Sequence, residues 1–133
     1  MRVLHLDHVT LVVRDLEASR RFYVDLLGMT EVARPAFSFD GKWFQAGATQ
    51  IHLILEHAES GPGGEQSPRA KIRSRAHHFA FEVEDGRAFA EFLRQKAAPI
   101  IAGPKDRPDG AVQVFLEDPD GYVVELYSRP GAS

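Results

Sequence analysis

The feature that most constrains the fold of this chain is a duplication, because residues 8–15 and residues 78–85 follow the same pattern. The first segment reads HVTLVVRD and the second reads HFAFEVED. In each segment a histidine opens an apolar, strand-like run and an aspartate closes it. The likeness continues to Phe22, which corresponds to Phe92. A repeat of this length predicts a supersecondary unit that occurs twice in the fold.

The first copy predicts a strand, a helix and then three more strands. Residues 3–13 are rich in Val and Leu, as in a buried strand. Asp15 is a typical helix N-cap, and a helix is expected over residues 16–27. Its inner face would be formed by apolar residues four positions apart, namely Ala18, Phe22 and Leu26. Glycines mark the turns between the later strands, which are expected at 30–34, 42–46 and 49–56.

The second copy predicts the same order of elements. A strand is expected over residues 77–84 and a helix over 86–96, capped by Asp85. The three strands that follow are expected at 99–102, 111–117 and 122–128. Residues 58–75 are dense in Gly and Pro and predict a flexible loop. The prediction is an α+β fold in a single domain, residues 1–133, made of two tandem βαβββ modules at residues 1–57 and 76–133.

The duplication also predicts which side chains are equivalent. Each module ends in an alternating strand, and aligning these strands pairs His52 with Glu125. His52 and Glu125 are 73 positions apart, whereas His8 and His78 are 70 positions apart. The second module therefore contains three more residues between its first and last strands, and the loop around residues 104–110 can hold them. Four equivalent inward positions follow, and all four carry side chains that can bind a divalent cation.

Strand periodicity alone does not choose between His77 and His78, since both rows of this strand contain apolar residues. The repeat does choose, because His78 superposes on His8 while His77 corresponds to Asp7. Glu82 shares the face of His78 but lies roughly 6.6 Å further along the strand. It is interpreted as a charge at the edge of the strand.

Two histidines and a carboxylate form a recurrent site for divalent metals. We expect His8, His78 and Glu125 to be the ligands, with positions left for water and substrate. The same ligand types suit Zn, Ni, Mn, Fe and Co, so the sequence does not choose the metal. His52 either completes a set of four ligands or is a strand histidine bonded to a neighbour.

Three further residues are candidates for substrate binding. Thr10 shares a strand face with His8 and would face the site. Arg107, in a loop before a strand, either clamps an anionic group or is a solvated charge. Trp43 belongs to an aromatic cluster that is either core or the wall of a pocket.

The composition limits the classes of partner and compartment. The net charge is −3 and the chain shows no basic stripe, so no nucleic-acid partner is expected. No apolar stretch is long enough to span a bilayer, and the first residues do not resemble a signal peptide, so no membrane partner is expected. The absence of cysteine excludes thiolate ligands and fits a reducing compartment. We expect a cytoplasmic protein that acts on a small molecule.

Several motifs together resemble the vicinal oxygen chelate superfamily. They are LDHVTLVVRD at residues 6–15, the helix with Phe22-Tyr23 and LLG at 26–28, DPDG at 118–121 and VEL at 124–126. That group includes glyoxalase I (lactoylglutathione lyase), methylmalonyl-CoA epimerase, fosfomycin-resistance thiol transferases, extradiol dioxygenases and bleomycin-resistance proteins. The resemblance covers nearly the whole chain outside residues 58–75.

The resemblance implies paired βαβββ modules that curl around a metal-lined cleft. In short members it implies a homodimer with sites shared between chains, His8 from one and His78 and Glu125 from the other. These three residues match the ligand pattern of the family, and Glu125 can also act as the catalytic proton shuttle. His52 departs from the glyoxalase pattern, in which a glutamate stands at this position.

The function implied is that of a metal-dependent lyase or isomerase, similar to lactoylglutathione lyase. Two alternatives remain open. One is an extradiol-type Fe(II) dioxygenase, since a set of two histidines and one carboxylate also serves that chemistry. The other is a non-enzymatic, drug-binding protein of the bleomycin-resistance type, which would not need this metal set.

Overall fold

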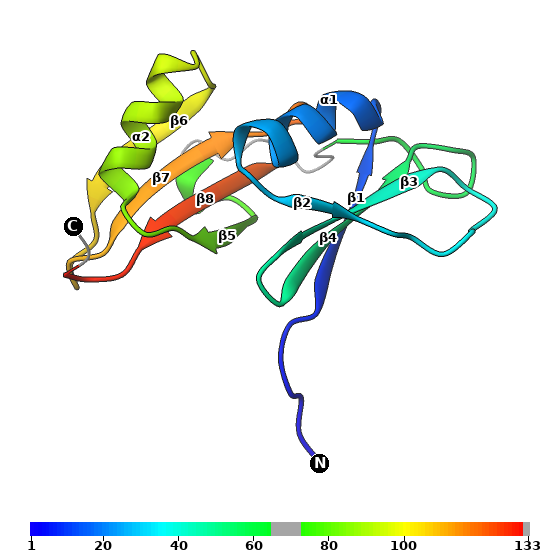
Figure 1. Ribbon diagram of the computed structural model, residues 1–133, viewed down its shortest axis with the longest axis horizontal. Coiled ribbons are helices and arrows are strands. Elements are labelled where there is room, and N and C mark those ends of the chain that lie inside the picture. Colours follow the sequence, from blue (N-terminus) through cyan, green and yellow to red (C-terminus); the bar gives the residue numbers. More distant parts are fainter. Residues whose placement is uncertain (65–72, 132–133) are drawn as a thin grey trace. The chain divides into compact units, whose positions relative to one another are not determined.

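The computed structural model describes residues 1–64 and 73–131. The chain divides into two compact units, with the boundary between Gly64 and Glu65. Each unit contains one four-stranded sheet and helical segments, and the element order follows the predicted repeat. Figure 1 shows these elements in chain order from blue to red. The α+β prediction of two βαβββ modules is therefore confirmed.

In the first unit, β1 runs parallel to β4, and the strand order is β1-β4-β3-β2. The strands are β1 (His8–Val13), β2 (Thr30–Val32), β3 (Gly41–Ala46) and β4 (Thr49–Leu55). Two helical segments follow each other without a break, α1 (Leu16–Arg20) and η1 (Arg21–Leu26). The core of this unit contains fully buried side chains from the helices and the sheet, namely Val13, Tyr23, Phe44, Ile51 and Leu53.

The second unit repeats this plan, with the strand order β5-β8-β7-β6. Its strands are β5 (His78–Glu82), β6 (Ile100–Asp106), β7 (Val112–Glu117) and β8 (Val123–Ser128). A short 3₁₀ turn, η2 (Arg73–Arg75), precedes β5, and α2 (Gly86–Gln95) follows it. The core is built from Leu93 of α2 and apolar residues of the sheet, namely Val114, Leu116, Val124 and Leu126.

The two helix starts are equivalent in atomic detail. The Oδ1 atom of Asp15 accepts hydrogen bonds from the backbone N–H groups of residues 17 and 18. The Oδ1 atom of Asp85 does the same for residues 87 and 88. Both predicted N-caps are confirmed, and each satisfies backbone donors that have no partner within the helix.

Strand register confirms the equivalence of His52 and Glu125. In the first unit Thr10 of β1 pairs with His52 of β4, and in the second Ala80 of β5 pairs with Glu125 of β8. Thr10 and Ala80 are 70 positions apart in the repeat. Because side chains alternate along a strand, this register places both residues on the same face as the repeat histidines.

The strand predicted over residues 3–13 is wrong at its start, because β1 begins only at His8. Val3, Leu4 and Leu6 are 91%, 79% and 66% exposed. The reason is the register, since His8 already pairs with Gln50 and β4 begins at Thr49. Residues before Asp7 therefore extend past the end of their neighbouring strand.

The helix predicted over residues 16–27 is present, but its second half has π-helical hydrogen bonds. The N–H of Leu27, for example, donates to the carbonyl of Phe22, five residues earlier. A wider turn rotates the following side chains relative to an α-helix. The buried face is therefore Ser19, Phe22 and Tyr23, whereas the predicted Ala18 and Leu26 are only half-buried.

The extra length of the second module was predicted to lie in the loop around residues 104–110, which is only partly correct. Strand β6 continues to Asp106 and contains two register shifts against β7, one between Ile100 and Ala102 and one between Ala102 and Lys105. The turn after β7 is also longer. Five residues, 118–122, separate the paired Glu117 and Val123, whereas four residues, 46–49, separate the equivalent pair of the first module, Gln45 and Gln50.

Only the ends of the predicted flexible loop at residues 58–75 can be compared. His57 forms an isolated antiparallel bridge with Gly61, and residues 73–75 form the 3₁₀ turn. Residues 65–72 of this loop lie outside the described residues. Among the helices of the described part, none has the length and apolar character needed to cross a bilayer.

Candidate metal-binding site

In the second unit, the sheet brings together two of the predicted ligands. His78 opens β5 and Glu125 lies in the middle of β8, its parallel neighbour. The Nε2 atom of His78 lies 3.0 Å from Oε1 of Glu125. The Glu125 side chain is 8% exposed and that of His78 is 26% exposed, so the pair is largely sheltered but reachable.

The hydrogen bonds of His78 show which of its ring nitrogens carries a proton. Its Nδ1 atom lies 2.7 Å from the carbonyl oxygen of Ala76, which can only accept, so Nδ1 carries a proton. In the neutral ring, Nε2 then presents a lone pair to a carboxylate oxygen of Glu125. Two lone pairs repel at this distance, so a positive charge belongs between these atoms. That charge is either a proton, which makes His78 an imidazolium, or a metal ion.

The distances fit a metal ion. Metal bonds to imidazole nitrogen and carboxylate oxygen are about 2.1 Å long. Two such bonds place the ligand atoms about 3.0 Å apart at the right angles of octahedral coordination and about 3.4 Å apart in a tetrahedron. The 3.0 Å between Nε2 of His78 and Oε1 of Glu125, which is also a hydrogen-bond distance, is therefore compatible with a shared octahedral ion. The second carboxylate oxygen, Oε2, accepts a hydrogen bond of 3.1 Å from Nε2 of Gln113 on β7.

His8, the third predicted ligand, lies in the first unit, and its Nδ1 atom contacts an oxygen acceptor as that of His78 does. Its Nδ1 atom lies 2.8 Å from Oδ2 of Asp7, so Nδ1 is the donor and the lone pair is on Nε2. The hydrogen bond from His8 lowers the pKa of the Asp7 carboxyl below its ordinary value. A carboxylate or carbonyl that binds the other ring nitrogen is the usual support of a metal-ligating histidine.

His52 lies on the same sheet face as His8 but in a different setting. Its ring is stacked between Trp43, at a centroid distance of 3.8 Å, and His8, at 3.9 Å. Its Nε2 atom lies 2.7 Å from Oε1 of Gln50. Burial is the main cause that lowers the pKa of His52, and the positive charge that His8 carries when it is protonated adds to this effect.

The candidate substrate-binding residues lie near these ligands within each unit. Thr10 is exposed on β1, two residues after His8. In the second unit, Arg107 is paired with Asp109 through two hydrogen bonds of 2.9 and 2.6 Å, and its guanidinium lies over the ring of Tyr127. Arg107 therefore already has an anionic partner within the chain. Such a partner is common for a charged residue of a loop and is not required of a residue that binds an anionic substrate.

Each unit supplies part of the predicted set. Within neither unit do the described residues include three or more His, Asp or Glu side chains placed to hold one ion. Glu125 and His78 come together in one unit, and His8 and His52 in the other. Gln113 and Asp7, which support two of the predicted ligands, were not predicted. Gln113 pairs with Tyr127, two residues beyond Glu125 on the same strand, so the signal that can find it is a polar residue diagonal to the ligand in strand register. Asp7 directly precedes its ligand in the sequence.

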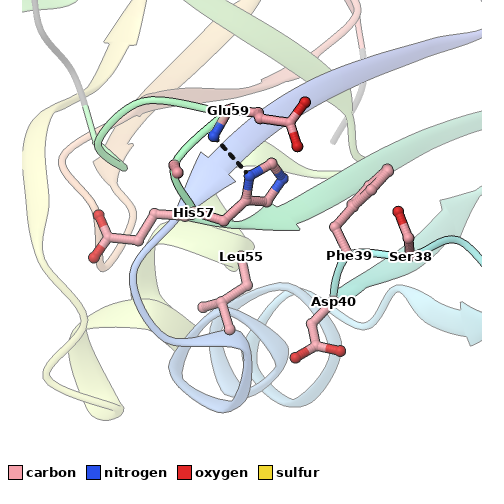
Figure 2. A pocket seen from close by; sticks show the side chains of 8 residues that line it. Ser38, Phe39, Asp40, Leu55, His57 and Glu59 are labelled. Atoms are coloured by element: carbon pink, nitrogen blue, oxygen red, sulfur yellow. Dashed lines mark hydrogen bonds between the residues drawn. The ribbon is translucent and has the colours of Figure 1, made fainter.

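A pocket in the first unit is lined by none of the predicted residues. It has a volume of about 400 Å³ and lies between the segment before β3 and the end of β4, lined by Ser38, Phe39, Asp40, Leu55, Glu56, His57, Ala58 and Glu59. Figure 2 shows the His57 ring, whose Nδ1 accepts a hydrogen bond of 3.1 Å from the backbone N–H of Glu59. Its three carboxylates make it unsuited to an anionic ligand.

Comparisons with known proteins agree with the observed fold. The sequence profile of the Glyoxalase/Bleomycin resistance protein/Dioxygenase superfamily matches residues 5–126. The chain is 33% identical to an ethylmalonyl-CoA/methylmalonyl-CoA epimerase of Cereibacter sphaeroides, covering 91% of this chain and 95% of the relative. It is 28% identical to a lactoylglutathione lyase of Neisseria meningitidis, covering 95% and 91%. A glyoxalase/dioxygenase structure from Nostoc punctiforme superposes with a TM-score of 0.75 at 26% identity, covering 98% of each chain.

Proposed function

Because the chain belongs to the Glyoxalase/Bleomycin resistance protein/Dioxygenase superfamily, we propose that it is a metal-dependent lyase or isomerase. Its substrate would be a small oxygenated metabolite. The proposed ligands of the divalent ion, which would be Zn, Ni, Mn, Fe or Co, are His8, His78 and Glu125. The observation that carries the proposal is the 3.0 Å contact of Nε2 of His78 with Oε1 of Glu125, which a divalent ion can bridge in place of a proton.

The bound ion would supply positive charge that polarises two oxygens of the substrate and stabilises negative charge on them. The residues of the chain perform the remaining tasks. His8 and His78 each commit Nδ1 to an oxygen acceptor, which fixes the rings and leaves Nε2 as the ligand atom. Thr10 is exposed beside His8, where its hydroxyl can bind a polar group of the substrate.

Glu125 is the proposed proton shuttle. A carboxylate positioned next to a reacting carbon can remove a proton and return it. Epimerisation next to a carbonyl requires both steps, and an epimerase is among the relatives of this chain. Gln113 binds Oε2 of Glu125, so Oε1 is the atom that can exchange between ligation and proton transfer.

The proposed site would require both modules. One ligand belongs to the first unit and two belong to the second, so neither module alone holds the full set. We propose a homodimer in which each site combines His8 of one chain with His78 and Glu125 of the other. Such an arrangement supplies two complete sites for each pair of chains.

The proposal is tested by hydrogen exchange. The protein is stripped of metal with a chelator and reloaded with each divalent metal. It is then incubated in D₂O with thioesters and hemithioacetals that carry a hydrogen next to a carbonyl. We expect metal-dependent incorporation of deuterium, followed by NMR, and its loss in Glu125→Gln. Oxygen uptake with a catechol and Fe(II), without deuterium incorporation, would instead establish a dioxygenase. Ligand binding unaffected by chelators would establish a non-enzymatic binding protein.

A further inference from the structure

We infer that His52 is a positioning residue for His8 and not a metal ligand. This inference rests on the proposed function, since it specifies which side chains make up the metal set. Its basis is the stack of three rings on one face of the first unit's sheet, formed by Trp43 of β3, His52 of β4 and His8 of β1.

The geometry of the stack prevents His8 and His52 from binding the same ion. A metal ion lies close to the plane of each imidazole that ligates it, along the lone pair of a ring nitrogen. The rings of His8 and His52 are stacked with centroids 3.9 Å apart and planes inclined by only 17°. An ion about 2.1 Å from a nitrogen of one ring and in its plane is therefore far from the plane of the other.

Hydrogen bonds show which nitrogen of His52 is engaged by a neighbour. The Gly47 carbonyl can only accept, so Nε2 of Gln45 faces it at 2.9 Å. The Oε1 atom of Gln45 then accepts from Nε2 of Gln50 at 3.0 Å. Oε1 of Gln50 is left to accept from Nε2 of His52 at 2.7 Å. His52 thus carries a proton on Nε2 and keeps its lone pair on Nδ1, the opposite arrangement to neutral His8 and His78, whose Nδ1 atoms are engaged.

The sheet explains why His52 has this role. Trp43 pairs directly with His52 across β3 and β4, and the two rings are parallel within 1°. Neighbouring strands lie about 4.8 Å apart, a spacing that lets flat side chains of adjacent strands stack. The indole thus supports one face of the His52 ring, and the other face supports His8. Because the His8 ring lies against the His52 ring, the side chain of His8 can adopt fewer rotamers.

The consequence concerns the coordination of the ion. With His52 outside the set, His8, His78 and Glu125 are three protein ligands. Three ligands leave more positions for water and substrate oxygens than four. Substrate oxygens could then bind at positions that no side chain of the chain occupies.

The test compares His52→Phe with His52→Ala. Phe keeps a flat ring in the stack but has no ligating nitrogen, whereas Ala removes both. The imidazoles bound to Cu²⁺ are counted by pulsed EPR, and Zn²⁺ affinity is measured by calorimetry. We expect two bound imidazoles in the wild type and in both variants. Affinity should stay close to wild type in His52→Phe and fall about 10–100-fold in His52→Ala, as for other supports of ligands. Three imidazoles in the wild type and two in His52→Phe would overturn the inference.

A metal-free measurement separates this inference from the proposed function. In the stack, the ring protons of His8 are shifted by the ring current of His52, which NMR detects in the apo protein. The shift should persist in His52→Phe and vanish in His52→Ala, and fluorescence of Trp43, the single tryptophan, should change with it. If the protein binds no divalent ion, the proposed function fails, while these shifts still decide the role of His52. Identical His8 shifts in the wild type and His52→Ala would contradict that role.

Discussion

His78 and Glu125 are joined by a contact of 3.0 Å between Nε2 and Oε1, although they lie 47 residues apart in the chain. The parallel pairing of β5 with β8 creates this contact. The other ring nitrogen of His78 and the other oxygen of Glu125 are both engaged, by Ala76 and Gln113. The pair is therefore oriented at both ends before any ion binds.

Removing the support of Glu125 should weaken metal binding. In Gln113→Leu, the carboxylate loses the donor to Oε2 and can rotate away from His78. We expect divalent-metal affinity to fall about 10–100-fold, the usual effect of losing a partner of a ligand. Calorimetric titration measures this. Gln95→Leu, at an exposed position near the end of α2, is the matched control. Equal affinity in Gln113→Leu and the wild type would show that Gln113 does not support the ligand.

The two helix caps should contribute equally to stability. Asp15→Ala and Asp85→Ala each remove a side-chain acceptor that binds two backbone N–H groups. Each substitution should lower the free energy of unfolding by about 1 kcal/mol, measured by urea denaturation. The corresponding Asp→Asn variants keep an acceptor oxygen and should remain within a few tenths of a kcal/mol of wild type. Destabilisation by Asn as large as that by Ala would argue against capping.

Asp109 should titrate at an unusually low pH. Its hydrogen bond from Arg107 is the main cause that lowers its pKa from 3.8 to about 2. Because the pKa is lower in the folded chain, this interaction stabilises the fold above the ordinary pKa and is lost as the pH falls through about 2. Carbon-13 NMR of the carboxyl measures the midpoint, which should move back toward 3.8 in Arg107→Leu. An unchanged midpoint would show that Arg107 is not held by Asp109.

The duplicated pattern was sufficient to predict both modules, both N-caps and the equivalence of His52 with Glu125. These features depend on periodicity and local hydrogen bonds, which short sequence segments encode. The start of β1 could not be predicted in this way. Val3, Leu4 and Leu6 have the composition of a strand, but the length of β4 decides whether they have a partner.

The candidate site could be described from the sequence only in part for a similar reason. The repeat makes His8 equivalent to His78 and His52 equivalent to Glu125, and these four positions supply the candidate ligands. The role of Gln113 depends on the register of β7 against β8, and the stack of Trp43 on His52 depends on side-chain rotamers. Sequence patterns contain neither kind of information before the strands are paired. The register shifts in β6 were missed because a bulge adds residues without changing the apolar pattern.

Shared sites require two chains to associate. We expect a homodimer at micromolar concentration, measured by light scattering together with metal content. The reason is that the proposed site takes His8 from one chain and His78 and Glu125 from the other. A monomer that retains one ion per chain would contradict the shared arrangement and leave the ligands themselves in place.

The most direct test of the proposed metal set compares His78→Ala with His77→Ala, two neighbouring exposed residues of which only His78 contacts Glu125. Elemental analysis of each purified variant, after equilibration with Zn²⁺ and removal of free ions, measures bound metal per chain. His78→Ala should abolish stoichiometric binding and His77→Ala should retain it. Equal metal content in the two variants, whether both full or both lost, would contradict the assignment of His78 as a ligand.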